Sequence, residues 1–135
     1  MPYSVEFAAG TSFFYATERR HLYFVISDPL IDEDAVLCVN FTSYEPSRPA
    51  GVYNDPACIV EKGEHRFVDH PTCVAYGSAW VTTLNLLEYK LSVKQLWFDF
   101  PASNELLGKM RLSAGDSIYM EAGAWQILVD QDLAN

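Results

Sequence analysis

Apolar runs separated by turn-forming residues dominate the first 85 residues of the chain. The two clearest runs, residues 21–27 and 35–42, combine aromatic and β-branched side chains, which favour buried strands. Residues 43–56 contain prolines, a glycine and an asparagine, so we expect mostly loop there. Several short strands of this kind predict a small barrel or a strongly curved sheet. The shorter apolar segments lie at 11–15, 58–60, 72–76 and 79–83.

A different periodicity begins after Pro101. Residues 103–113 carry a capping serine, an early acid, late basic residues and apolar side chains at helical spacing, which predicts a short helix. The segment 124–129 suits either a closing strand or a second helix, and Gly123 weakens a continuous helix. The chain therefore reads as a single domain over residues 1–135, β-rich α+β, with one or two short helices, one of them in the C-terminal part.

Size and composition agree with one globular domain. The chain has 135 residues, half of them hydrophobic, which is enough for one real core. It has no run of about 18 apolar residues, so we expect no membrane span. The first residues lack the pattern of a secretory signal, and three cysteines without a disulfide framework favour a reduced, cytoplasmic setting.

The charge balance changes which partners are plausible. Nine basic residues stand against eighteen acidic ones, giving a net charge of −9, so a basic footprint over the whole surface is missing. A local basic site centres on residues 19–21, with Arg48, Lys62 and Arg66 as candidate neighbours. Acidic residues cluster at 28–34, which keeps a basic protein partner open as an alternative.

The window of residues 55–76 carries most of the candidate chemistry. It holds two of the three histidines, His65 and His70, and two of the three cysteines, Cys58 and Cys73. Histidine transfers protons near neutral pH and, with thiolate, binds transition metals. On a straight strand the odd spacing of the histidines would place them on opposite faces, so they converge only across a bend.

Three segments of the first half resemble a PemK/MazF-like toxin. They are Gly10-Thr-Ser-Phe-Phe-Tyr, Arg20-His-Leu-Tyr-Phe-Val-Ile-Ser27 and Val36-Leu-Cys-Val-Asn-Phe-Thr-Ser43. A second set is similar to a branch of small bacterial proteins sometimes assigned to that superfamily: Asp55-Pro-x-Cys, Gly63-Glu-His65 and His70-Pro-x-x-Val-x-Tyr76. The resemblance covers about residues 10–85 and implies a small SH3-like barrel.

The resemblance also implies an activity. Proteins of that superfamily are typically dimeric endoribonucleases whose RNA groove is occupied by an antitoxin protein. It places the active-site arginine at Arg20, where the family's Arg-Pro dipeptide is Arg20-His21 here, and the substrate-positioning hydroxyl at Thr42 or Ser43. The partners it implies are single-stranded RNA, an antitoxin and a second copy of the chain.

Metal-independent RNA cleavage needs a base, an acid and a cation for the phosphorane charge. We assign proton transfer to His65 or His70, and we expect no cofactor. Stacking and phosphate contacts add a set of substrate-binding candidates, because aromatic faces stack on bases and arginine binds phosphate. These candidates are His21, Tyr44, Tyr76 and Arg66.

Three other interpretations stay open. In the first, each histidine only fixes its loop through a hydrogen bond to a backbone carbonyl or a carboxylate. The set Cys58, His65, His70 and Cys73 has the donor types of a zinc site, although its spacing lacks the tight pairs of common zinc modules. The third is a non-enzymatic acidic binding or inhibitory module, phage- or plasmid-type, that docks on a basic protein.

Overall fold

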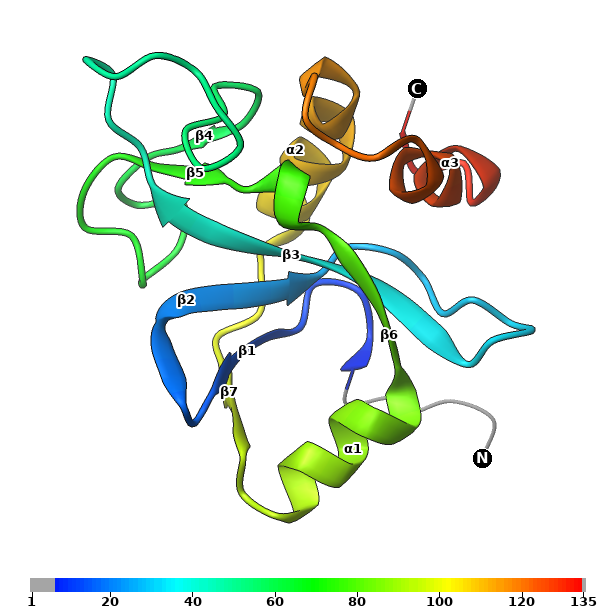
Figure 1. The fold of residues 1–135 in the computed structure, drawn as a ribbon. Helices are drawn as coiled ribbons and strands as arrows, with labels where there is room; N and C mark the ends of the chain where they lie inside the picture. Colours follow the sequence, from blue (N-terminus) through cyan, green and yellow to red (C-terminus); the bar gives the residue numbers. More distant parts are fainter. Residues whose placement is uncertain (1–6, 135) are drawn as a thin grey trace.

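A computed structural model describes residues 7–134, apart from the side chains of Arg19 and Arg20. It contains an antiparallel sheet and three α-helices (Figure 1). The strands are β1 (Ser12–Tyr15), β2 (Glu18–Val25), β3 (Ala35–Ser43), β4 (Ile59–Val60), β5 (Thr72–Val74), β6 (Trp80–Thr83) and β7 (Leu96–Asp99). The helices are α1 (Leu84–Ser92), α2 (Asn104–Ser113) and α3 (Ala122–Asp130), and two short 3₁₀ turns are η2 (Tyr76–Ser78) and η3 (Ala114–Asp116).

Strand β3 is the centre of the sheet. The strand order is β4-β5-β3-β2-β1-β7, and β6 also pairs with β3. One edge of β3 is shared, because Ala35–Cys38 pair with β6 whereas Phe41–Ser43 pair with β5. The opposite edge pairs with β2, where Tyr23 stands opposite Asn40.

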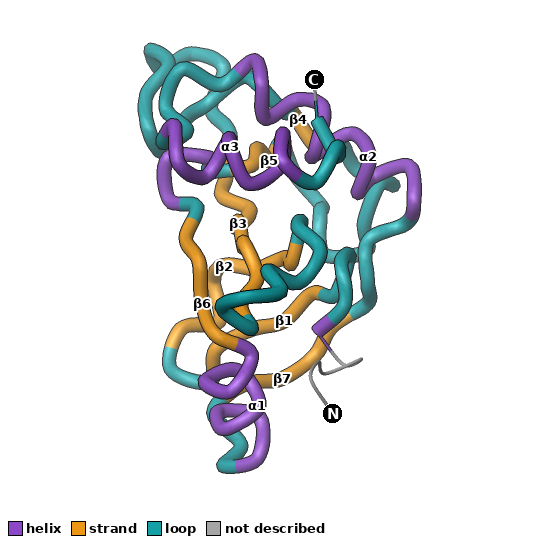
Figure 2. The backbone as a smooth tube through the Cα atoms, turned by 90° about the vertical axis from the view of Figure 1, so that its right-hand side faces the viewer, coloured by secondary structure: helices purple, strands orange, loops and turns teal. Residues whose placement is uncertain are grey.

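Each face of β2 and β3 is covered by its own core. On one face Leu37, Val39 and Phe41 are buried with side chains of β2, α2 and α3. On the other, Val36 and Cys38 are buried with side chains of β1, α1 and β7. Figure 2 shows the resulting arrangement, with α2 and α3 at one end of the molecule and α1 at the other. Burial on both faces explains why residues 35–42 form an almost continuous apolar run in the sequence.

The β-rich α+β class predicted from the sequence is confirmed. The predicted helix at 103–113 is α2, whose Ser103 side chain accepts a hydrogen bond from the Leu106 N–H at 3.1 Å. The ambiguous segment 124–129 lies in a helix, α3. No helix in residues 7–134 is long and apolar enough to cross a membrane.

Helix α1 and strand β7 were not predicted, so the helix count of one or two was too low. The signals of α1 are nonetheless present in the sequence: Thr83 caps the helix by accepting a hydrogen bond from the Leu86 N–H, and Leu84 and Leu87 recur at helical spacing and are buried. They were obscured because Thr83 also ends a strand, so the two elements adjoin without a loop.

Tyr76 links the segment after β5 to helix α2 through the core. Its ring is fully buried, and its hydroxyl donates a hydrogen bond of 2.6 Å to the Met110 carbonyl. Met110 lies in the last turn of α2, where carbonyls lack helical partners. Burial raises the pKa of Tyr76, so the hydroxyl stays protonated and keeps donating.

The substitution Tyr76→Phe tests this link. We expect it to lower the free energy of unfolding by about 1–3 kcal/mol, because a buried carbonyl loses its donor. Urea unfolding followed by circular dichroism measures the change. The matched control is Tyr53→Phe, whose ring is 71% exposed and whose stability should stay within about 0.5 kcal/mol of wild type. Equal midpoints for Tyr76→Phe and wild type would contradict the role of the hydroxyl.

Candidate functional site

The backbone brings several predicted site residues to one end of the sheet. Because β2 and β3 are antiparallel, the start of β2, with Arg20 and His21, lies at the same end as Thr42 and Ser43 (Figure 1). The side chain of Arg20 lies outside the described part of the chain. Side chains alternate between faces along a strand, so Ser43 shares a face with Phe41, and Asn40 lies on the other face.

Ser43, His70 and Asp69 form a hydrogen-bonded array at this end. The Ser43 Oγ lies 2.8 Å from His70 Nε2, and His70 Nδ1 lies 2.6 Å from Asp69 Oδ1. A carboxylate only accepts hydrogen bonds, so Nδ1 donates to Asp69 and the neutral ring accepts the Ser43 hydroxyl proton at Nε2. The hydrogen bond from His70 lowers the pKa of Asp69. This is the arrangement of a hydroxyl, a base and a group that orients the base.

Backbone pairing fixes the position of the array. Ser43 stands opposite Thr72 where β3 pairs with β5, and the Tyr44 N–H donates to the Pro71 carbonyl at 2.9 Å. The His70 side chain is 52% exposed, so a substrate can reach its ring. The array therefore combines a fixed serine and an accessible imidazole.

Two hollows flank His70. One, of about 50 Å³, is lined by Thr42, Ser43, Phe67 and neighbouring side chains. The other, of about 290 Å³, is lined by Glu61, Lys62 and Asp69 together with apolar groups. Lys62 is thus a cation beside the array. The sequence had indicated Lys62 only as a candidate neighbour of the basic residues 19–21.

His65 is placed differently from His70, because its ring is buried. The Phe67 N–H donates to Nδ1 at 3.1 Å, so Nε2 carries the proton and donates to the Phe100 carbonyl at 2.7 Å. The ring also meets Phe24 and Phe41 edge-on. Both nitrogens are therefore used by the backbone, which favours the loop-fixing role over the catalytic role predicted for His65.

The remaining substrate-binding candidates do not join the array. Tyr76 is fully buried and hydrogen-bonded to α2, so a core role replaces the predicted contact with substrate. Arg66 donates to Asp99 and lies over the Phe100 ring at 3.9 Å, so its guanidinium is already paired. Tyr44 is half-buried beside Ser43, and His21 belongs to the pocket on the other face.

The four residues of the alternative zinc site are not brought together. Among residues 7–134, no group of three or more His, Cys, Asp or Glu side chains has the geometry to hold a metal ion. Burial raises the pKa of Cys73 to about 11 and also raises that of Cys58, which disfavours the thiolate that a metal needs. The zinc interpretation is therefore corrected.

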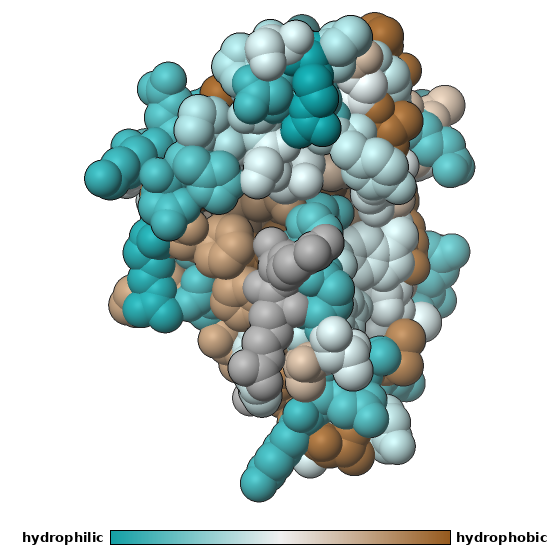
Figure 3. Space-filling model, turned by 60° about the vertical axis from the view of Figure 1, so that its left-hand side comes forward, coloured by the Kyte–Doolittle hydropathy of each residue, from teal (hydrophilic) through white to brown (hydrophobic). Residues whose placement is uncertain are grey.

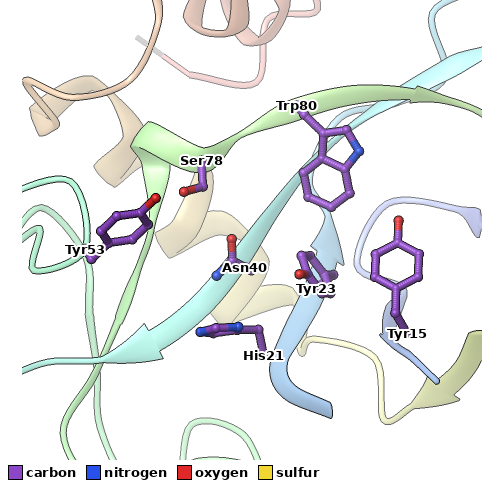
Figure 4. A pocket seen from close by; sticks show the side chains of 7 residues that line it. All are labelled: Tyr15, His21, Tyr23, Asn40, Tyr53, Ser78 and Trp80. Atoms are coloured by element: carbon purple, nitrogen blue, oxygen red, sulfur yellow. The ribbon is translucent and has the colours of Figure 1, made fainter. Parts of the chain in front are cut away.

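A larger pocket of about 440 Å³ lies on the opposite face of β3. Figure 4 shows its lining, which sequence reasoning largely missed because six elements or loops contribute to it. One signal was present, since Asn40 is a polar residue inside an apolar strand pattern. The lining residues are Tyr15, His21, Tyr23, Asn40, Tyr53, Ser78 and Trp80.

The acidic segment lies at the other end of β2 and β3. Asp28, Asp32 and Glu33 line a groove of about 510 Å³ in the β2–β3 loop, where Ile31 is 79% exposed. The Gln131 side chain joins this loop to the end of α3 through two hydrogen bonds of 2.9 Å with the Asp28 backbone. These acids are thus separated from the Ser43–His70–Asp69 array by the length of β3 (Figure 1).

Comparison with known proteins adds no relative: no family model, curated protein or solved structure matches this chain.

The two histidines should respond differently to truncation. We expect His65→Ala to lower the free energy of unfolding by about 2–4 kcal/mol, because it opens a cavity and leaves the Phe67 N–H without its acceptor. The Phe100 carbonyl loses one of its two donors and keeps the Ser12 hydroxyl. His70→Ala should change stability by less than about 0.5 kcal/mol, because the ring is half exposed. Thermal and urea unfolding of both variants measure this contrast, and equal losses in the two would refute the division of roles.

Proposed function

We propose that the protein is a toxin-like endoribonuclease that cleaves single-stranded RNA by metal-independent acid–base chemistry. The observation that carries the proposal is the Ser43–His70–Asp69 array, in which Nε2 of a half-exposed imidazole lies 2.8 Å from a hydroxyl oxygen. If a ribose 2′-hydroxyl replaces the Ser43 hydroxyl at His70 Nε2, it donates its hydrogen bond to an imidazole that Asp69 already orients as a general base.

The reaction assigns one step to each group. His70 Nε2 takes the 2′-hydroxyl proton while the 2′-oxygen bonds to phosphorus, and the bond from phosphorus to the 5′-oxygen breaks. The products are a 2′,3′-cyclic phosphate and a 5′-hydroxyl, whose proton comes from water because the site is open. Lys62 and, from the resemblance, Arg20 balance the phosphorane charge, while Thr42 and Ser43 position the ribose.

Without a second histidine to act as acid, the array forgoes a contribution of about 10²–10⁴ in rate, so we expect slow turnover. The net charge of −9 also limits phosphate affinity, and RNA binding should weaken further as salt is raised. The position of the acidic loop at the far end of the sheet supports the proposal, because it leaves the array free of that negative cluster.

The resemblance to PemK/MazF-like toxins supports the same proposal. We infer that the curved sheet corresponds to the SH3-like barrel of that superfamily, and that the chain pairs with a second copy and with an antitoxin. Three free cysteines, all buried, agree with the reduced, cytoplasmic setting that we propose.

Cleavage of a fluorescently labelled single-stranded RNA in the presence of EDTA tests the proposal. We expect wild type to produce cyclic-phosphate ends, His70→Ala to lose at least about 100-fold in rate, and Ser43→Ala to lose less than about 10-fold. Tyr89→Ala, which removes an exposed side chain on α1 away from the array, serves as the control. Intact RNA with wild type, or equal rates for wild type and His70→Ala, would refute the assignment, whereas a loss in Ser43→Ala as large as that in His70→Ala would identify Ser43 as a nucleophile.

A second candidate function is the acidic binding module. The observation that favours it is the groove in the β2–β3 loop, where an exposed isoleucine stands among carboxylates. Such a surface suits a basic protein segment, with contacts from both charge and apolar area.

A lysine-rich peptide that carries one leucine serves as the probe for this groove. We expect the double variant Asp32→Asn, Glu33→Gln to weaken its binding by at least about fivefold, a loss of roughly 1 kcal/mol. The matched control, Glu105→Gln with Glu121→Gln, removes the same charge from exposed positions on other elements. Calorimetry at fixed salt measures the peptide affinity of both double variants. If both weaken binding equally, the peptide is attracted by net charge alone, and the groove is excluded as its binding site.

A further inference from the structure

We infer that the pocket lined by Tyr53, Asn40 and Trp80 binds one nucleobase. The inference rests on the proposed function, since it assigns to this pocket the recognition of a base in the RNA. It goes beyond that function because the pocket lies on the other face of β3 from the Ser43–His70–Asp69 array.

Aromatic side chains stand on two sides of the pocket. In Figure 4, Tyr53 comes from the loop after β3 on one side, and Trp80, Tyr23 and Tyr15 stand together on the other. The second group is rigid, because Tyr23 meets Tyr15 at 5.1 Å and Trp80 at 5.2 Å between ring centroids, both edge-on. Tyr53 is 71% exposed, so its ring is accessible to a ligand. Such walls suit a flat aromatic ligand, because every base offers a face for stacking.

The polar groups between these walls suit the edge of a base. Asn40 is only 8% exposed, and its Nδ2 donates to the Phe41 carbonyl at 3.0 Å, which fixes the amide. Apart from the side chains of Arg19 and Arg20, which are not described, no group in residues 7–134 donates a hydrogen bond to Asn40 Oδ1, so this acceptor is available to a ligand. Ser78 also lines the pocket, and in Figure 4 it lies, like Asn40, between Tyr53 and the group of Trp80, Tyr23 and Tyr15. A fixed amide reads a base through its donor and acceptor groups.

His21 completes the lining and is held by a carboxylate. Its Nδ1 lies 2.7 Å from Glu18 Oε2, which leaves Nε2 for a ligand. Burial raises the pKa of Tyr15 to about 12, so this wall is uncharged near neutral pH. The pocket therefore suits a neutral heterocycle better than a phosphate group.

The position of the pocket agrees with a subsite on one RNA strand. Asn40 and Ser43 lie three positions apart on β3, which is about 10 Å along the strand. A single strand that passes around the end of β3 places one base in the pocket and its neighbouring phosphate near His70. The pocket volume of about 440 Å³ is sufficient for one nucleoside and is typical of a small-ligand site.

Calorimetry with the four nucleoside monophosphates AMP, GMP, CMP and UMP tests the inference. We expect saturable binding of at least one of them and no binding of ribose 5-phosphate. Tyr53→Ala, which removes an exposed ring, should weaken that binding at least about fivefold. The control is Tyr89→Ala, an exposed tyrosine on α1 outside the pocket, which should leave affinity unchanged.

Four outcomes would overturn the inference: no saturable binding at millimolar nucleotide, equal binding of ribose 5-phosphate, tighter binding of a disaccharide such as cellobiose, or no difference between Tyr53→Ala and Tyr89→Ala. The result is separable from the proposed cleavage. Saturable nucleotide binding by wild-type protein that leaves RNA intact would retain the pocket and reject only the nuclease.

Discussion

The burial of β3 on both faces is the constraint on which the rest of the structure depends. A strand in that position must pair along both edges and must carry apolar side chains in both directions, because any unpaired group would be buried without water. The chain meets the first requirement with β2 on one edge and with β5 and β6 on the other. It meets the second with two separate cores.

The shared edge of β3 creates the space for both candidate sites. Between β5 and β6 the chain leaves the edge through η2, and the Ala75 N–H donates to the Asn40 carbonyl at 2.9 Å. This departure from the edge of β3 places Ser78 and Trp80 beside Asn40 in the lining of the aromatic pocket. The pocket opens to solvent at the border of the core that contains Val36 and Cys38. Beyond it, pairing with β5 holds Ser43 next to the loop that carries His70. The face of the molecule in Figure 3 is mainly polar, with apolar residues gathered in a few areas.

Local sequence patterns predicted most of the helices and strands. They did not predict which segments pair when those segments lie far apart in the sequence. Residues 35–42 read as a buried strand because both cores fill that strand, and Ser103 marked the start of α2 because capping is local. Strand β7 was missed because its exposed Trp97 and Phe98 gain strand structure only by pairing with β1. The aromatic pocket was missed for the same reason, since its walls come from segments far apart in the sequence. Ser43 and His70 were both predicted, yet their contact across 27 positions was not readable from spacing.

The two histidines of the predicted window show how one short segment supports both stability and chemistry. His65 points inward, where its nitrogens satisfy the Phe67 N–H and the Phe100 carbonyl and so fasten the loop to the segment before α2. His70 follows after a bend and points outward, where its ring meets Ser43. The odd spacing therefore allows one ring to lie in the core and the other to lie at the surface. His65 fixes the loop that carries His70, so His70 is held in place although it does not lie on a strand. Its half-exposed imidazole can therefore keep the fixed orientation that a general base requires.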